Sequence, residues 1–302
     1  MDGVLIVDKP AGPTSHDIVA SVRRATGWGR VGHTGTLDPL ATGVLPLVIG
    51  RATRLARFLS ATDKVYEAEV RLGWATDTYD AQGTPIDITG LKPSATGPEI
   101  VTADDLEAVL ERFRGSYLQP APPFSAKRID GVRAYTLARN GHAAVTKQCP
   151  VTVHELVCLE RTAECLRLRL RCSAGFYVRT FAHQLGLALG NGAHLSALRR
   201  TRSGDFDATA AVALETVLRE GGEATGRLVP LERLLPWMPA VLVTEAGAAR
   251  TLHGNELHAE DFRLPPDAAS PWLRVVDEHG ALLAIAEACG KPGVLHPRVV
   301  VR

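Results

Sequence analysis

The chain has 302 residues, 45% of them hydrophobic, and a formal net charge of +1. This length allows one large domain and a small one, and the hydrophobic share excludes a mainly disordered protein. The sequence has no basic leader and no apolar run near the ~20 residues that a membrane helix needs, so we expect a soluble, cytoplasmic protein without a membrane partner. Five cysteines without a C-x-x-C pair are typical of reduced thiols rather than of a zinc site or a disulfide framework.

Over residues 1–230 the hydrophobic pattern predicts strands and helices without a regular alternation, which is typical of an α+β fold. Thr14 or Ser15 is a candidate cap for the first helix. In chain order we expect a strand at 4–7, a helix ending near Gly27, a strand at 44–49, a helix at 52–59, a strand at 66–72, a helix from 102 to 113, a hairpin turning at 130–131, a strand at 166–172, a helix through 181–189, and short helices at 212–218 and 231–235.

The composition changes after Pro236 and Pro239. Short β-like segments separated by glycine and proline follow, which indicates a small separate β domain. We therefore expect a large domain over 1–235 and a small one over 240–302. The strands expected in the small domain are 241–243, 273–276, 282–286 and 298–301.

Positive charge is concentrated in two segments. Residues 18–62 contain six arginines and one carboxylate, Asp38, and residues 165–204 contain seven arginines and no acid. Because the rest of the chain is acidic, these segments are candidate phosphate-binding surfaces. The alternative is that the arginines lie on ordinary solvated faces of strands and helices.

The spacing of Gly27, Gly29 and Gly32 matches a dinucleotide-binding fingerprint, which needs a strand before it and a helix after it. Here a helix is predicted before it, so we reject this interpretation. The sequence contains no phosphate-binding lysine loop, no H-E-x-x-H motif and no EF-hand, and it therefore predicts neither a metal nor a cofactor.

Asp38 is the strongest candidate for a catalytic residue. It precedes Pro39, which favours an extended loop, and Gly35 and Gly43 allow unusual backbone angles on either side. The arginines of this segment favour the ionised carboxylate, so Asp38 is a candidate nucleophile or general base. A plain Asp-Pro turn is the ordinary alternative.

Four further residues are candidates for the same site. His33 could orient Asp38, stack on a base or only form a hydrogen bond within its loop. Tyr66 and Tyr177 border the basic segments, where aromatic rings stack on unpaired bases, although half-buried strand tyrosines are equally common. Arg179 follows at a predicted strand-to-helix junction, and its guanidinium could pair with Asp38.

The loop of Asp38, GHTGTLDPLATGVL at residues 32–45, resembles the catalytic signature of the TruB family of tRNA pseudouridine synthases. The resemblance extends over residues 3–206, with small departures at Thr36 and Phe176. Further blocks follow in the family's order: VDKP at 7–10 with TS at 14–15, KVYEA at 64–68, SAK at 125–127, YVRT at 177–180 and GAHLSALRR at 192–200.

The resemblance implies a mixed-sheet catalytic domain that isomerises uridine 55 in the T loop of tRNA. It also implies a small β-barrel-like, PUA-like RNA-binding domain at 240–302, a likeness carried loosely by Gly254 and by Gly280 with Leu282. The implied partner is the T stem-loop, bound by a monomer without a cofactor.

The resemblance also assigns roles. Asp38 is the nucleophile, which attacks either the uracil ring or the ribose, and Arg179 pairs with it. Tyr66 stacks on the base and is a candidate acceptor for the C5 proton. The remaining assignments are Tyr177 and Leu198 lining the pocket, His33 filling the space of the flipped nucleotide, and Lys9 with Pro10 supporting the pocket.

Two rival functions remain open from the sequence. A tRNA-folding chaperone would use the same surface without catalysis, and a base-excising glycosylase would also use a lone aspartate. The continuous family resemblance disfavours the glycosylase.

Overall fold

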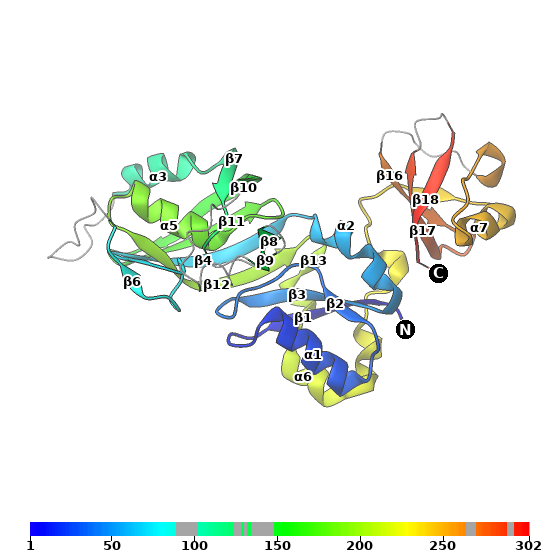
Figure 1. Cartoon of the computed structure of the whole chain (residues 1–302), viewed down its shortest axis with the longest axis horizontal. Helices are drawn as coiled ribbons and strands as arrows, with labels where there is room; N and C mark the ends of the chain where they lie inside the picture. The colour runs from blue at the N-terminus through cyan, green and yellow to red at the C-terminus, as the bar shows by residue number, and fades with distance from the viewer. Residues whose placement is uncertain are drawn as a thin grey trace. The chain divides into compact units, whose positions relative to one another are not determined.

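The computed structural model describes residues 1–88, 102–123, 128–129, 132–133, 148–263, 270–288 and 293–301. The chain divides into two compact units. The first unit contains residues 1–37, 45–60 and 209–302, and the second contains residues 38–44 and 61–208. Figure 1 shows the elements of both units, and each unit is described by itself.

The N-terminal part of the first unit is built on the apolar strand β1 (Gly3–Lys9), which lies between β14 (Val212–Ala213) and β3 (Thr42–Ile49). Strand β2 (Val31–His33) pairs antiparallel with β3, with His33 opposite Leu47. Helix α1 (Ser15–Thr26) packs against α6 (Leu214–Glu220) (Figure 1). Strands buried this completely are usually apolar without alternation, as residues 4–7 of β1 are.

Helix α1 begins and ends where its sequence predicts. Thr14 and Asp17 form a capping box, in which each side chain accepts a hydrogen bond from the other residue's backbone N–H. Gly27 ends the helix in the left-handed conformation, at φ 71°, which glycine adopts without a steric penalty. Gly27 and Gly29 therefore follow a helix, whereas a dinucleotide-binding fingerprint needs a strand before its first glycine.

The helix expected at 52–59 is present, but its first part is of another type. The chain forms a 3₁₀ helix, η1 (Gly50–Leu55), and then a short α-helix, α2 (Ala56–Ser60). The start of η1 is held to the N-terminus, because the Arg51 N–H donates to Asp2 Oδ1 at 2.6 Å. Over one or two turns, periods of 3.0 and 3.6 residues place apolar side chains almost alike, so the pattern could not separate them.

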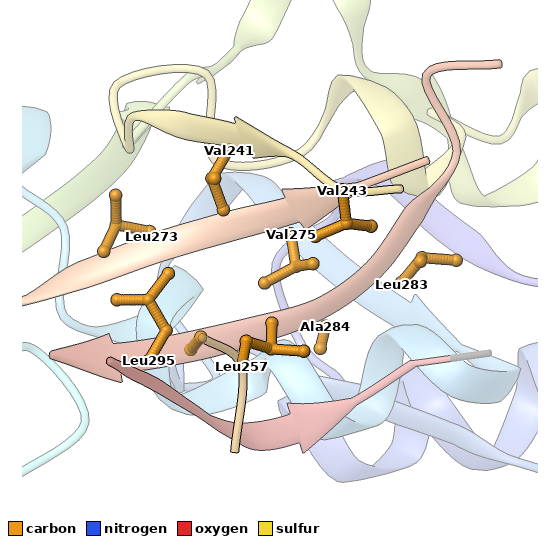
Figure 2. Close-up of a cluster of buried hydrophobic side chains, with 9 residues drawn as sticks. Val241, Val243, Leu257, Leu273, Val275, Leu283, Ala284 and Leu295 are labelled. Carbon is orange, nitrogen blue, oxygen red and sulfur yellow. The ribbon is translucent and has the colours of Figure 1, made fainter. Parts of the chain in front are cut away.

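The C-terminal part of the first unit is a four-stranded sheet in the order β15-β16-β17-β18. Nine buried apolar residues form its core; they come from all four strands and, outside the strands, from Val243 and Leu257 (Figure 2). All four expected strands are present, but helix α7 (Glu245–Leu252) was not expected. The strands are β15 (Ala240–Leu242), β16 (Trp272–Val276), β17 (Leu282–Ala288) and β18 (Leu295–Val300).

This small sheet does not close into a barrel in the described part of the chain. Strand β15 pairs parallel with β16, β16 and β17 pair antiparallel, and β18 pairs with β17 at the other edge. The mixed α+β class is confirmed, whereas closure of the C-terminal sheet is not observed. The division into domains at 1–235 and 240–302 stays a prediction.

The second unit is built on a mixed sheet in the order β3-β12-β4-β11-β10-β7. Strand β12 runs parallel to β3 and antiparallel to β4. Helix α5 lies against β4 and β12, and α3 lies beside α5 (Figure 1). The elements are β4 (Lys64–Leu72), α3 (Ala103–Glu111), β7 (Gly115–Pro120), β10 (Gln148–Arg161), β11 (Cys165–Cys172), α5 (Val178–Ala188) and β12 (Ala193–Ser203).

The other elements are short. Ile129 of β8 lies opposite Val132 of β9, as the expected hairpin requires, although its turn residues lie outside the described residues. No helix in the described ranges is both long and apolar enough to cross a membrane. The short elements are β5 (Ala75–Thr76), β6 (Pro85–Ile86), β8 (Arg128–Ile129), β9 (Val132–Arg133), β13 (Phe206–Asp207), η2 (Ala208–Ala210), η3 (Gly221–Arg227), η4 (Leu231–Arg233) and η5 (Ala259–Asp261). Of the two short helices expected at 212–218 and 231–235, the first is α6, preceded by β14, and the second is the single 3₁₀ turn η4.

Candidate active site

Asp38 lies on the loop between β2 and β3, as its position before Pro39 predicts. Its carbonyl oxygen accepts a hydrogen bond from the Ala41 N–H at 3.0 Å, which closes a turn over the two intervening residues. The loop then enters β3 at Gly43, where φ is 99° and an added Cβ would lie 2.2 Å from the Arg200 carbonyl oxygen. Only glycine fits there, so the end of the loop is fixed against β12.

The carboxylate of Asp38 is paired with Arg179 by two hydrogen bonds. Arg179 Nε donates to Oδ2 at 2.8 Å, and Nη2 donates to Oδ1 at 3.1 Å. The Arg179 side chain is 8% exposed and the Asp38 side chain 35% exposed. A buried guanidinium in this two-point geometry fixes the orientation of the carboxylate, while part of the carboxylate stays open to a ligand. The ion pair that the sequence predicted is therefore present.

The other edge of the Arg179 guanidinium contacts the turn after β5. Nη1 donates to the Thr78 carbonyl oxygen at 3.2 Å and lies 3.6 Å from Asp80 Oδ2. The Asp80 side chain is 6% exposed, and its Oδ1 accepts from Thr78 Oγ1 at 2.7 Å and from the Gln82 N–H at 3.0 Å. Sequence analysis missed Asp80, because no motif spacing connects this turn to Arg179.

Tyr66 faces the buried side of β4, where it lies opposite Leu170 of β11 and Arg200 of β12. Burial raises the pKa of its phenol, and the negative charge of Asp38 acts in the same direction, whereas the charge of Arg200 and a hydrogen bond with it act against them. The phenol is therefore protonated at neutral pH and available as a hydrogen-bond donor.

Arg200 joins this tyrosine to the end of the Asp38 loop. Its side chain is among the most buried of the described residues, and its Nε donates to the Val44 carbonyl oxygen at 2.7 Å. The arginine lies within the block at 192–200 that resembles the family, but no pattern in the sequence assigns it a role. Its position opposite Tyr66 depends on a bulge between Arg200 and Arg202, which the sequence does not show.

Lys64, two residues before Tyr66 on the same face, is also buried. Burial and the positive charge of Arg200 lower the pKa of Lys64 to about 8. Its Nζ donates to the Thr62 carbonyl oxygen, and in register it lies opposite Cys172. The alternation of β4 predicts the buried face but not that a lysine belongs to it.

Tyr177 and Leu198 lie on the elements that carry Arg179 and Arg200. Tyr177 immediately precedes α5, and its backbone is held by Gln119, which accepts from the Tyr177 N–H at 2.8 Å and donates to its carbonyl oxygen at 3.1 Å. Leu198 is 7% exposed and lies opposite Ala68 on β4. The second unit thus contains five of the predicted site residues. They are Asp38, Tyr66, Tyr177, Arg179 and Leu198.

The other three predicted residues belong to the first unit. Lys9 is fully buried, and its Nζ donates to the carbonyl oxygen of Pro10 at 2.9 Å. Nδ1 of His33 accepts from the Gly35 N–H at 3.4 Å, a local contact that the sequence left open as an alternative. The roles of Lys9, Pro10 and His33 toward Asp38 stay predictions.

Several arginines of the basic segments have acidic or aromatic neighbours within the protein. Arg169 lies 3.3 Å from Glu155, and Arg167 lies 3.5 Å from Glu160 and 3.8 Å from Glu67. In the first unit, Arg57 lies over the ring of Trp272, 4.7 Å from its centroid. The acidic partners come from neighbouring strands, which a charge count along the chain cannot show, and the interpretation of both segments as phosphate-binding surfaces stays a prediction.

Potential metal ligands are not clustered among the residues that the structure describes. In the ranges that the structure describes, no group of three or more histidine, cysteine, aspartate or glutamate side chains is placed to hold a metal ion. The four cysteines in these ranges form no disulfide with one another. They are Cys149, Cys158, Cys165 and Cys172.

Comparison with protein families places this site in a known context. Residues 23–178 match the N-terminal domain of the TruB family of pseudouridylate synthases, and residues 179–236 match the C-terminal domain of tRNA pseudouridylate synthase B. The tRNA pseudouridine synthase B of Solibacter usitatus is 45% identical over the whole of both chains. That of Geobacillus thermodenitrificans is 39% identical, also over the whole of both chains.

Solved structures with the same fold are known. The crystal structure of a Cbf5-Nop10-Gar1 complex contains a chain that matches with a TM-score of 0.76 at 25% identity, over 99% of this chain and 85% of that one. An H/ACA RNP bound to a substrate RNA containing 2'-deoxyuridine matches with a TM-score of 0.75, at the same identity and coverage. The resemblance found in the sequence is confirmed: the chain belongs to the TruB family of pseudouridylate synthases and is an isomerase of that kind.

Proposed function

We propose that this chain converts uridine 55 in the T loop of tRNA to pseudouridine, with Asp38 as the nucleophile. The names of its relatives, tRNA pseudouridine synthase B, support tRNA as the substrate. One observation carries the assignment of Asp38: its carboxylate is held by two hydrogen bonds from a buried guanidinium and is still one-third exposed.

The reaction is an isomerisation. The N1–C1′ bond between uracil and ribose breaks, a C5–C1′ bond forms, a proton leaves C5 and another arrives at N1. Asp38 forms a transient covalent bond with either the uracil ring or C1′ of the ribose, and it is released unchanged. The atoms and electrons balance without an oxidant or a second substrate, so the ionised carboxylate and groups that position the base are sufficient.

Arg179 orients Asp38, since its guanidinium is fixed on its other edge by Thr78 and Asp80. Tyr66 provides a ring for stacking on the flipped base, a contact that contributes about 1–3 kcal/mol per base. This offsets part of the few kcal/mol that removing a nucleotide from its stack costs. Because its pKa is raised, the Tyr66 phenol is scarcely ionised, which favours stacking and hydrogen bonding over taking the C5 proton.

The remaining assignments belong to the same proposal. Tyr177 and Leu198 line the pocket, Lys9 and Pro10 support it, and His33 fills the space left by the flipped nucleotide. The large domain at 1–235 performs catalysis, and residues 240–302 add RNA contacts. We propose that the protein acts as a monomer in the cytoplasm, without a cofactor.

The experiment is to locate pseudouridine in an unmodified tRNA transcript after incubation with the wild-type protein, with Asp38→Asn and with Asp63→Asn. Asp63 is a partly exposed carboxylate of the same unit and serves as the matched control. We expect product at position 55 for the wild type and for Asp63→Asn, and none for Asp38→Asn, with tRNA affinity changed by no more than a few fold. Product from Asp38→Asn above one per cent of the wild-type amount would exclude Asp38 as the nucleophile. A role as a folding chaperone alone would instead leave the wild type without product.

A further inference from the structure

The turn after β5 contains a strained residue that the proposed reaction does not use. Tyr79 has φ 65°, and among the described residues only one other non-glycine residue, Leu235, has a positive φ. An aromatic residue is unfavourable in this left-handed conformation and adopts it only where the surrounding structure enforces it. Such residues are concentrated at functional sites, so the contacts that hold Tyr79 are informative.

The conformation of Tyr79 decides what its neighbours present to Arg179. The residue before it, Thr78, offers its carbonyl oxygen to Arg179 Nη1 at 3.2 Å, and the residue after it, Asp80, places Oδ2 3.6 Å from the same nitrogen. The backbone of Tyr79 is fixed as well, because its carbonyl oxygen accepts from the Leu195 N–H at 3.0 Å. A different φ at Tyr79 would turn one of the two acceptors away from the guanidinium.

The ring of Tyr79 is held by His183. The two ring centroids are 3.9 Å apart and the planes differ by 9°, which is a parallel stack. His183 lies four residues after Arg179 on α5, so both side chains project from the same face of the helix. The turn therefore contacts two successive turns of α5, through Arg179 and through His183.

The histidine contributes a neutral ring to this stack. Nδ1 of His183 is buried and has no hydrogen-bond partner among the described residues, and burial lowers the pKa of the imidazole. A protonated ring would leave a buried N–H unsatisfied and would carry a positive charge one helical turn from Arg179. Stacking, rather than a hydrogen bond from Nδ1, thus holds the ring in place.

We propose that the stack of Tyr79 on His183 is a positioning element for the Asp38–Arg179 pair. It maintains the left-handed backbone at Tyr79, and this backbone keeps Thr78 and Asp80 against the far edge of the guanidinium. No contact joins either ring to Asp38 in the described residues, so both act through Arg179. The inference rests on the proposed function only for its activity measurements.

The test separates strain from stacking. In Tyr79→Ala a positive φ is still unfavourable and the ring that enforces it is absent, whereas Tyr79→Gly loses the ring but adopts a positive φ freely. We expect the single-turnover rate to fall about tenfold in Tyr79→Ala and clearly less in Tyr79→Gly, with tRNA affinity within twofold of wild type. His183→Ala should behave like Tyr79→Ala, and His183→Phe should restore most of the rate by restoring an aromatic stack. Leu187→Ala, an exposed residue one turn further along α5, is the control and should match wild type.

A second readout does not depend on any RNA. Arg179 Nε–H donates to Asp38, so its exchange with solvent, measured by NMR, should be slow in the wild type and at least tenfold faster in Tyr79→Ala. Slow exchange in a wild type that forms no pseudouridine would refute the proposed function and leave this inference standing. Equal rates and exchange in Tyr79→Ala, Tyr79→Gly and wild type would overturn the inference, and so would a loss confined to tRNA affinity.

Discussion

Replacing Arg179 with lysine separates the geometry of this side chain from its charge. The guanidinium makes two hydrogen bonds to Asp38 and one to the Thr78 carbonyl oxygen, from three different nitrogens. An ammonium group is a single point with rotating donors and does not span both partners. We expect it to keep one bond to Asp38 and to lose the second bond and the contact with Thr78.

The size of the effect follows from these contacts. A hydrogen bond that involves a charged group contributes about 1.5–3 kcal/mol, so losing two gives about 3–6 kcal/mol. If half of this or more is expressed as misplacement of the nucleophile in the transition state, the rate falls at least tenfold and up to about 10⁴-fold, since each 1.36 kcal/mol is a factor of ten. Affinity for tRNA should change little, because the Arg179 side chain is 8% exposed and its donors face the protein.

The assay is a single-turnover measurement with the protein in excess over RNA labelled with tritium at uracil C5, which reports loss of the C5 hydrogen. Arg227→Lys is the matched control, because Arg227 also binds a carboxylate, that of Glu220, through Nε and Nη2, but on the surface of the first unit. We expect wild-type rates from this control. A rate for Arg179→Lys within threefold of wild type, or a loss explained by weaker binding, would refute the reasoning.

Three further predictions concern Tyr66, Lys64 and the salt dependence of tRNA binding. Tyr66→Phe should retain tRNA binding and at least one-tenth of the wild-type rate, measured by the same tritium release. The reason is that a buried phenol with a raised pKa is poorly suited to take the C5 proton. A rate below one per cent of wild type would assign this role to the hydroxyl. Between pH 8 and 10.5 the unfolded chain binds a proton at Lys64 that the folded chain has lost. The free energy of unfolding, measured with urea, should therefore rise with pH over this range by at most about 3 kcal/mol. Lys64→Met should abolish this rise. The slope of log tRNA affinity against log salt concentration should lie well below the roughly ten units that all arginines of both basic segments would give at ~0.7–0.9 per phosphate. Deleting residues 240–302 should lower this slope only modestly and should leave the T stem-loop a substrate. A slope near ten, or a folded truncated protein that binds the stem-loop but does not convert it, would contradict this prediction.

The sequence predicted those elements whose pattern is regular. Strand β4 alternates buried and more exposed residues from Lys64 to Leu72. Helix α1 has typical capping residues at both ends, Thr14 and Gly27. Strands β10 and β12 were not predicted, although they are the longest in the second unit. Both contain bulges that shift the side-chain alternation, so no continuous period of two is visible along their sequences.

The same physical reason limits what could be predicted of the site. The pairing of Arg179 with Asp38 was predictable because each residue stands out within its own segment. Asp80 and Arg200 were not, because their roles arise from register: Asp80 forms a bridge with Leu195, and Arg200 lies opposite Tyr66 only beside an irregularity in the strand. A sequence identifies groups with distinctive chemistry, while the partners of those groups depend on contacts between distant strands.

Asp38 is the only acidic residue within residues 18–62, but in the fold it shares Arg179 with a second carboxylate, that of Asp80. In the described residues the arginine paired with its carboxylate is Arg179, which lies outside the basic segment of residues 18–62 and is also 3.6 Å from Asp80. One guanidinium between two carboxylates leaves the cluster with a net negative charge, so Asp38 is oriented without being fully neutralised. A nucleophile needs both properties, a fixed direction and remaining negative charge. The turn containing Thr78, Tyr79 and Asp80 supplies the second carboxylate, and its strained backbone is therefore part of the same arrangement as the Asp38 loop.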